Sequence, residues 1–95
     1  LNEYVAEDMD KTPELETLEV PEGGLVVEAH MAGSIWKVEC HVGDNVTKNE
    51  VLAIIEAMKI EIPIVAPKRM RVDQVLIHQG DTVKTGQALL VLAPE

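Results

Sequence analysis

The second half of the chain repeats the first half at a fixed offset of 37 residues. At this offset residues 43–46, Gly-Asp-Asn-Val, align with residues 80–83, Gly-Asp-Thr-Val, and Leu52 aligns with Leu89. Apolar residues fall on apolar residues through most of the two copies, 25–55 and 62–92. Neither copy is long enough to bury a core alone. The repeat therefore predicts one domain, in which the two copies pack together about a pseudo-twofold axis.

Each copy contains short segments rich in Val and Ile that are separated by turn residues. With aromatic residues at only 2% of the chain, the core must be aliphatic, and β-branched residues favour strands. Gly43-Asp44 and Gly80-Asp81 are typical of tight turns, and Asn49 and Gly86 tolerate a positive φ. We expect an all-β fold, a flattened barrel or sandwich of two similar halves, with strands at residues 26–29, 35–41, 51–56, 62–66, 72–78 and 88–92.

Residues 50–61 fit this scheme poorly, because their apolar residues follow helical spacing and no Gly, Pro, Asn or Asp marks a turn. The repeat nevertheless requires a strand on each side, so the chain must turn at Met58 and Lys59. The midpoint of the two copies also falls between these residues. We expect the pseudo-twofold axis to pass through this turn, with Leu25 and Leu92 beside each other at the opposite pole. Lys59 is then displayed far from the ends of the domain.

The acidic residues are concentrated in residues 1–24, which contain eight Asp and Glu against Lys11 alone and close on Pro-Glu-Gly-Gly. This segment is expected to be a linker, or the end of a helix of an upstream domain, and residues 25–95 the folded domain. A net charge of −9 argues against nucleic acid and membrane partners. The single Cys40 and the absence of a secretory pattern favour a cytoplasmic location.

Residues 56–61, Glu-Ala-Met-Lys-Ile-Glu, lie between the two Gly-Asp-x-Val turns and precede Ala66-Pro67. This arrangement resembles the biotinyl domain of biotin-dependent carboxylases, also called the biotin carboxyl carrier. The resemblance implies two four-stranded antiparallel sheets and biotin joined to the ε-nitrogen of Lys59 on an exposed hairpin. It also implies three partners, which are biotin protein ligase, biotin carboxylase and carboxyltransferase. The neighbours through which the ligase would recognise the hairpin are Glu56, Ala57, Met58, Ile60 and Glu61.

The flanking residues narrow this resemblance. Residues 21–24, 32–38 and 61–63 resemble the C-terminal biotinyl domain of urea carboxylases, including the urea amidolyase fusions. The segment 40–46 is too short for the protruding thumb of some bacterial carriers. The chain departs from the family pattern at Ile60, where Met is usual, at His30, where Pro is usual, and at Met70, where the second copy should repeat Gly33.

Several other interpretations remain open. A lipoyl-type carrier shares the fold, but it usually has an acidic residue before its lysine and Ala after it. The host could instead be an acyl-CoA or pyruvate carboxylase, or the chain could be an unmodified interaction module. Glu56 and Glu61 could serve only as solubilising charges. The recurrence of His41 and His78 favours paired structural roles over a metal site. We expect no catalytic activity of the domain itself, because no nucleophile with an adjacent base can be assembled.

Overall fold

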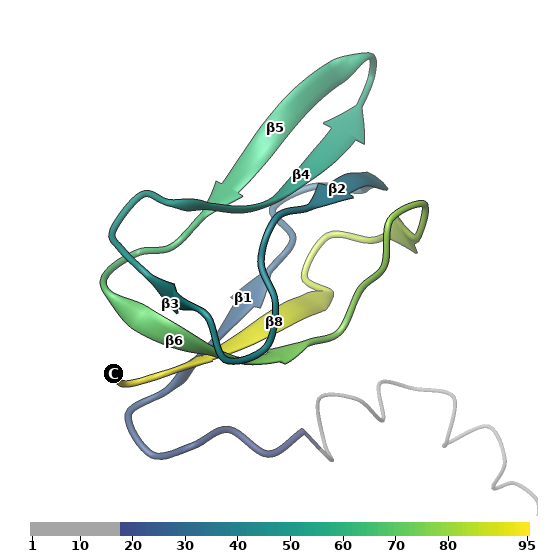
Figure 1. The fold of residues 1–95 in the computed structure, drawn as a ribbon. Helices are drawn as coiled ribbons and strands as arrows, with labels where there is room; N and C mark the ends of the chain where they lie inside the picture. Colours follow the sequence, from purple (N-terminus) through teal and green to yellow (C-terminus); the bar gives the residue numbers. More distant parts are fainter. Residues whose placement is uncertain (1–17) are drawn as a thin grey trace, which may run out of the picture.

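A computed structural model describes residues 18–95, which form eight strands arranged as two four-stranded antiparallel sheets (Figure 1). One sheet has the order β1-β8-β6-β3 and the other the order β5-β4-β2-β7. The all-β fold class expected from the repeat is confirmed. The strands are β1 (Leu25–Glu28), β2 (Gly33–Val38), β3 (Asn45–Val46), β4 (Val51–Ala57), β5 (Ile60–Val65), β6 (Met70–Val75), β7 (Thr82–Val83) and β8 (Ala88–Ala93).

The two halves follow the same path through space. Strands β2, β3 and β4 begin 37 residues before β6, β7 and β8, and the two sheet orders become identical when each strand is exchanged for its counterpart. The hydrogen bonds that join the halves come in matched pairs. Gly43 N–H donates to the carbonyl of Val72 at 2.8 Å, and its counterpart Gly80 N–H donates to the carbonyl of Ile35 at 2.8 Å. The predicted pseudo-twofold packing is therefore present in the backbone.

One aliphatic core lies between the two sheets, and both halves contribute to it. Among the described residues no polar or charged side chain is buried. Burial of aliphatic surface contributes about 1.5–3 kcal/mol for each Leu, Ile or Val side chain fully removed from water. The largest fully buried side chains are Ile35, Leu52, Ile55, Met70, Leu89, Leu90, Leu92, Val46, Val72, Val83 and Val91.

The observed strands differ from the expected ones at several ends, and no strand was expected at β3 or β7. Strands β3 and β7 contain two residues each, too few for an alternating pattern, and they directly follow the expected turns at residues 43–44 and 80–81. Strands β2 and β6 end at Val38 and Val75, before the expected ends, because the chain leaves the sheet toward the next turn. In both turns an aspartate accepts the backbone N–H of a histidine three residues earlier: His41 donates to Asp44 Oδ2 at 2.8 Å and His78 to Asp81 Oδ2 at 2.7 Å.

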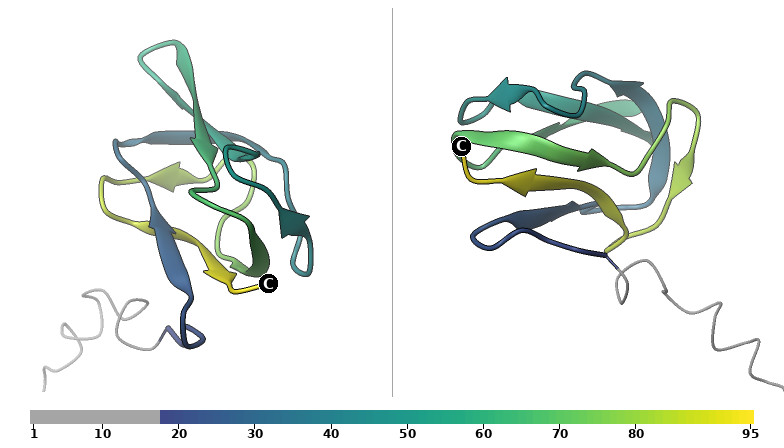
Figure 2. Two further views of the ribbon diagram at one scale, coloured as in Figure 1. Left: turned by 90° about the vertical axis from the view of Figure 1, so that its left-hand side faces the viewer. Right: turned by 60° about the horizontal axis from the view of Figure 1, so that its bottom comes forward.

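The expected position of the pseudo-twofold axis was wrong. The offset that superposes the halves pairs Met58 with Glu95 and Lys59 with Glu22, so the turn is exchanged with the ends of the domain and does not lie on the axis. The expected proximity of the ends is confirmed, because Leu25 is the cross-strand partner of Leu92. The left view of Figure 2 shows the β4–β5 hairpin at one extreme of the molecule, with the C-terminus and the start of β1 toward the other. The symmetry thus places Lys59 far from the point where the chain enters.

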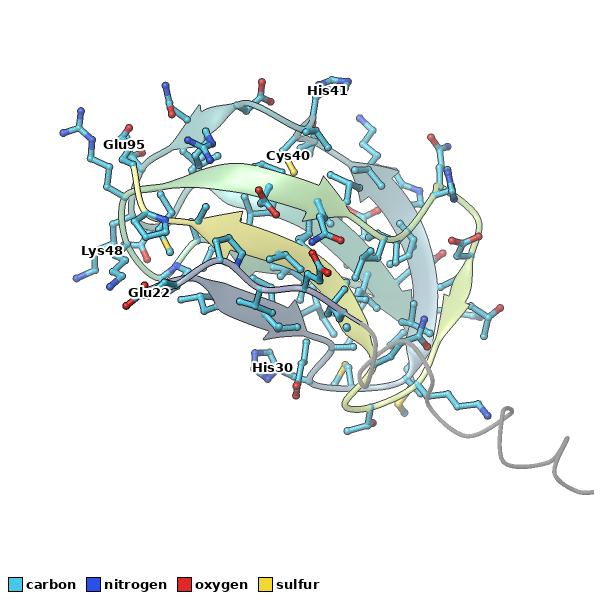
Figure 3. All side chains as sticks on the ribbon, turned by 90° about the horizontal axis from the view of Figure 1, so that it is seen from below. Glu22, His30, Cys40, His41, Lys48 and Glu95 are labelled. Atoms are coloured by element: carbon cyan, nitrogen blue, oxygen red, sulfur yellow. The ribbon has the colours of Figure 1, made fainter. Side chains whose placement is uncertain are left out.

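Residues 18–24 lie across the outer face of the sheet that contains β8 (Figure 3). The side-chain amide of Gln74 donates to the carbonyl oxygen of Glu19 at 2.8 Å, and Gly24 N–H donates to that of Pro21 at 2.8 Å. Val91 shares this outer face with Gln74, and it is 0% exposed. The linker interpretation stays a prediction, and residues 1–17 lie outside the described residues. Within the described part, no helix is long and apolar enough to cross a membrane.

Burial of Cys40 in this core predicts a thiol that is hard to modify. The residue is 4% exposed, and burial raises the pKa of its thiol to about 11, with the nearby carboxylates of Asp44 and Glu50 adding to the effect. Because the thiolate is the nucleophile, iodoacetamide at pH 8 should label the folded protein far more slowly than the urea-unfolded protein. Mass spectrometry measures the labelling rate of each sample. Equal rates for the folded and the unfolded protein would contradict the burial of Cys40.

The same raised pKa makes stability depend on alkaline pH. The folded state keeps the thiol proton up to about pH 11, whereas the unfolded chain releases it near its ordinary pKa of 9.0. Between these values the folded state binds more protons, so the contribution of Cys40 to the free energy of unfolding falls as the pH rises. Cys40→Ala should weaken this alkaline dependence in urea melts.

Candidate functional site

The β4–β5 hairpin ends in a two-residue turn made by Met58 and Lys59. Ala57 pairs with Ile60 directly below the turn, and Glu56 pairs with Glu61 below that. Both turn residues have positive φ, 54° at Met58 and 68° at Lys59. Two consecutive positive φ angles are what a tight type I′ turn between twisted antiparallel strands requires. The sequence argument placed the turn correctly, although these residues carry no turn signal of their own.

This turn is held in place by its surroundings and not by its residues. Such turns favour Asn and Gly, whereas the left-handed conformation costs other residues about 1–2 kcal/mol each. The pairing of β4 with β5 extends from Ala57↔Ile60 down to Val51↔Val65, and this ladder forces the chain to reverse at Met58. Backbone strain of this kind persists where neighbouring structure over-determines it, and it is often found at functional sites.

The tip of the hairpin projects beyond the rest of its sheet (Figure 1). Strand β2 accompanies β4 only as far as the pair Ser34↔Glu56, so the last residues of the hairpin have no further strand beside them. Lys59 is exposed, Met58 is 91% exposed and Ile60 is 61% exposed. Within residues 18–95, Lys59 makes no ion pair with any carboxylate. Within the described part of the chain, the Lys59 side chain is thus exposed to solvent at the tip of the projection.

Two carboxylates lie at the base of this tip. Glu56 and Glu61 are cross-strand partners, and both are exposed. Like charges directly opposite each other on a sheet are destabilising by a fraction of a kcal/mol, about 0.2–1 kcal/mol. The hairpin thus presents a lysine, two exposed apolar side chains and an acidic pair on one small projection. Among the described residues no group of three His, Cys, Asp or Glu side chains could hold a metal ion.

Gly33 supports the hairpin from strand β2, a role that the sequence argument missed. A Cβ atom at Gly33 would lie 2.6 Å from the carbonyl oxygen of Glu56 and 2.8 Å from Cγ2 of Ile55. Only glycine lets β2 pass this close to the base of the hairpin. The counterpart in the other half is Met70, whose side chain is 1% exposed. The departure of Met70 from the repeat was the signal that could have identified this position.

The other residues singled out in the sequence lie away from the hairpin tip. His41 and His78 are exposed at matched turns, where Asp44 and Asp81 accept their backbone N–H groups, and paired structural roles for the two imidazoles stay a prediction. Trp36 is 39% exposed on β2, and the ammonium nitrogen of Lys37 lies 5.1 Å from the centre of its ring.

Comparison with known proteins identifies relatives of the whole domain. A family model described as "Biotin-requiring enzyme" matches residues 16–92. The chain is 44% identical over 69 residues to a biotin/lipoyl attachment protein of Bacillus subtilis, covering 73% of this chain and 94% of that protein. It is 42% identical to a pyruvate carboxylase of Staphylococcus aureus over 67% of this chain, and 34% identical to a urea amidolyase of Saccharomyces cerevisiae over 96% of this chain.

Two solved carboxylases contain a domain of the same fold. A single-chain, multi-domain long-chain acyl-CoA carboxylase matches with a TM-score of 0.77 and 29% identity, and it covers 94% of this chain and 10% of that protein. The urea carboxylase of Kluyveromyces lactis matches with a TM-score of 0.73 and 34% identity, over 78% of this chain and 6% of that protein. The chain spans only 6% of the pyruvate carboxylase and 5% of the urea amidolyase. It matches the small attachment protein nearly end to end.

Relief of the backbone strain in the turn should be measurable. Met58→Gly should raise the free energy of unfolding by about 0.5–1 kcal/mol, because glycine adopts a positive φ without strain and Met58 buries almost no surface. Met58→Ala removes the same side chain but keeps the strain, so it serves as the control and should not stabilise the domain. Urea melts compare the three proteins. Destabilisation by Met58→Gly would show that the turn is not strained.

Proposed function

The chain belongs to the biotin-requiring enzyme family, and on that basis we propose that Lys59 is the residue to which biotin is covalently attached. The observation that carries this proposal is the position of Lys59 in a two-residue turn at the projecting end of the domain. An amide with biotin requires an amine that a second protein can surround, and an exposed hairpin tip offers one. The domain is a non-catalytic carrier.

The lysine needs help to react. A lysine ammonium has an ordinary pKa of about 10.4, so near neutral pH it is protonated and is not a nucleophile. A biotin protein ligase would supply both an activated biotin and the environment in which the amine loses its proton. Formation of the amide then removes the charge of Lys59. The exposed side chains of Met58 and Ile60, with Glu56 and Glu61 below them, form the surface that this ligase would recognise.

Once attached, biotin supplies a ureido nitrogen that can accept and release a carboxyl group. The contribution of this domain is to carry that nitrogen between a biotin carboxylase and a carboxyltransferase. Tethering raises the effective concentration of the carried group at both sites without requiring a tight interface. Because the β4–β5 hairpin projects from the domain opposite to the C-terminus and the start of β1, its tip can enter a deep site before the body of the domain meets the rim of that site (Figure 2).

Modification should depend on Lys59 alone. Co-expression with a biotin ligase should add the mass of one biotinyl group, and Lys59→Arg should abolish the addition while leaving the urea melt unchanged, because the exposed side chain buries little surface. Lys48→Arg, at another exposed turn lysine, is the matched control and should still be modified. A lipoyl mass, or full modification of the Lys59→Arg variant, would contradict the proposal.

We further propose that the parent protein is a cytoplasmic urea carboxylase. The support is the similarity to the urea amidolyase over 96% of this chain and the urea carboxylase-like residues around Trp36 and Pro63. The relatives also include a pyruvate carboxylase and an acyl-CoA carboxylase, so these hosts are the alternatives.

The host can be tested on the full-length parent protein. It should hydrolyse ATP in a reaction that depends on urea and bicarbonate, and Lys59→Ala should abolish this turnover because the carried group has no attachment point. ATP hydrolysis that depends on pyruvate or an acyl-CoA, with none on urea, would refute the urea host. That outcome would leave the role of Lys59 as the attachment residue intact.

A further inference from the structure

A shallow groove of about 480 Å³ opens beside the Lys59 hairpin. Its walls come from the loop before β2, from the hairpin and from β7. The apolar part includes Met31, Ala32 and Met58, and the polar part includes the hydroxyl-bearing Ser34 and Thr82. Met31 and Met58 are both exposed, so the groove offers apolar surface to water directly below the turn.

The residues that line the groove differ between the two halves of the pseudo-symmetric domain. In the other half Arg69 stands at the position of Ala32 and Met70 at the position of Gly33. Met70 is fully buried there, and Arg69 Nε lies 2.7 Å from Glu95 Oε1. On the side of the domain that carries Lys59, the small residues Ala32 and Gly33 therefore stand where the other half has Arg69 and Met70.

The groove is within reach of a group attached to Lys59. Met58 precedes the lysine directly and Ala57 lies two residues before it, about 7 Å along an extended strand. Apart from its planar amide bond, a biotinyl-lysine side chain consists of rotatable single bonds, and it is longer than this distance. The attached ring can therefore fold back along the hairpin without any movement of the backbone.

We propose that this groove is a resting site for the ring system of the biotin attached to Lys59, an inference that depends on the proposed function. The ring system has an apolar thioether side, which matches Met31, Ala32 and Met58. Its ureido group has N–H donors and a carbonyl acceptor, which match the hydroxyl groups of Ser34 and Thr82. Between transfers the domain itself holds the ring, and a partner domain must displace it from the groove.

NMR of the isolated domain tests this proposal directly. The biotinylated and unmodified domains are prepared with ¹⁵N label, and intact mass establishes that modification is complete. We expect modification to shift the amide signals of Gly33, Ser34 and Thr82, which are distant in sequence from Lys59. Nuclear Overhauser contacts should join the ring protons of biotin to the methyl groups of Met31 and Ala32.

A groove-filling variant provides the matched comparison. Ala32→Met should abolish the ring contacts and the distant amide shifts, because it fills the groove from an exposed position. Arg69→Met, at the counterpart position in the other half, should leave both unchanged. Shifts confined to residues 57–61 in the fully modified wild type, with no ring contact to the groove, would overturn the resting site. Failure to gain the biotinyl mass would instead overturn the proposed function.

Discussion

The shared aliphatic core between the two sheets is the constraint on which the rest of the structure depends. Each half supplies one β-strand at each position of the sheet order, and neither half could bury Leu52, Ile55, Leu89 or Leu92 alone. Packing of the halves about a pseudo-twofold axis sets the register of every strand. That register then obliges β4 and β5 to meet in a two-residue turn, and it places the turn at the end of the molecule opposite to Leu25 and Leu92.

The proposed attachment site lies where the two halves differ. Strands β4 and β5 are joined by the hairpin turn that carries Lys59. Their counterparts β8 and β1 are not joined to each other, because β8 leads to the C-terminus and β1 follows residues 18–24. Residues 18–24 cover the outer face of the β8 sheet, whereas Ile54, the counterpart of the buried Val91, remains partly exposed. Gly33 replaces the buried Met70 and lets β2 approach the base of the hairpin. The two halves thus share one core although they differ at the hairpin, on the outer sheet faces and, at Gly33 and Met70, within the packing itself.

The sequence predicted the features that depend on the repeat. The turn at Met58 and Lys59 followed from matching the two copies, even though local spacing indicated a helix. Features that local spacing does not encode were not predictable. Strands β3 and β7 lie within the repeat, but they are held by partners remote in sequence, and a two-residue strand has no periodicity. The contact of Gln74 with Glu19 and the tight approach at Gly33 are tertiary contacts that no local pattern encodes. The expected axis position was wrong because the twofold rotation moves the midpoint of the repeat, Met58 and Lys59, onto the ends of the domain. A residue that lies on a twofold axis is instead left in place by the rotation.

The central claim is that position in the fold selects one lysine from the six in the chain. The most direct measurement is peptide mapping of the ligase-treated domain by tandem mass spectrometry. The account predicts that biotin is found on Lys59, within residues 56–61, and that Lys11, Lys37, Lys48, Lys68 and Lys84 remain unmodified. Biotin on any of these other lysines, or distributed among several of them, would contradict the claim that the hairpin turn defines the site.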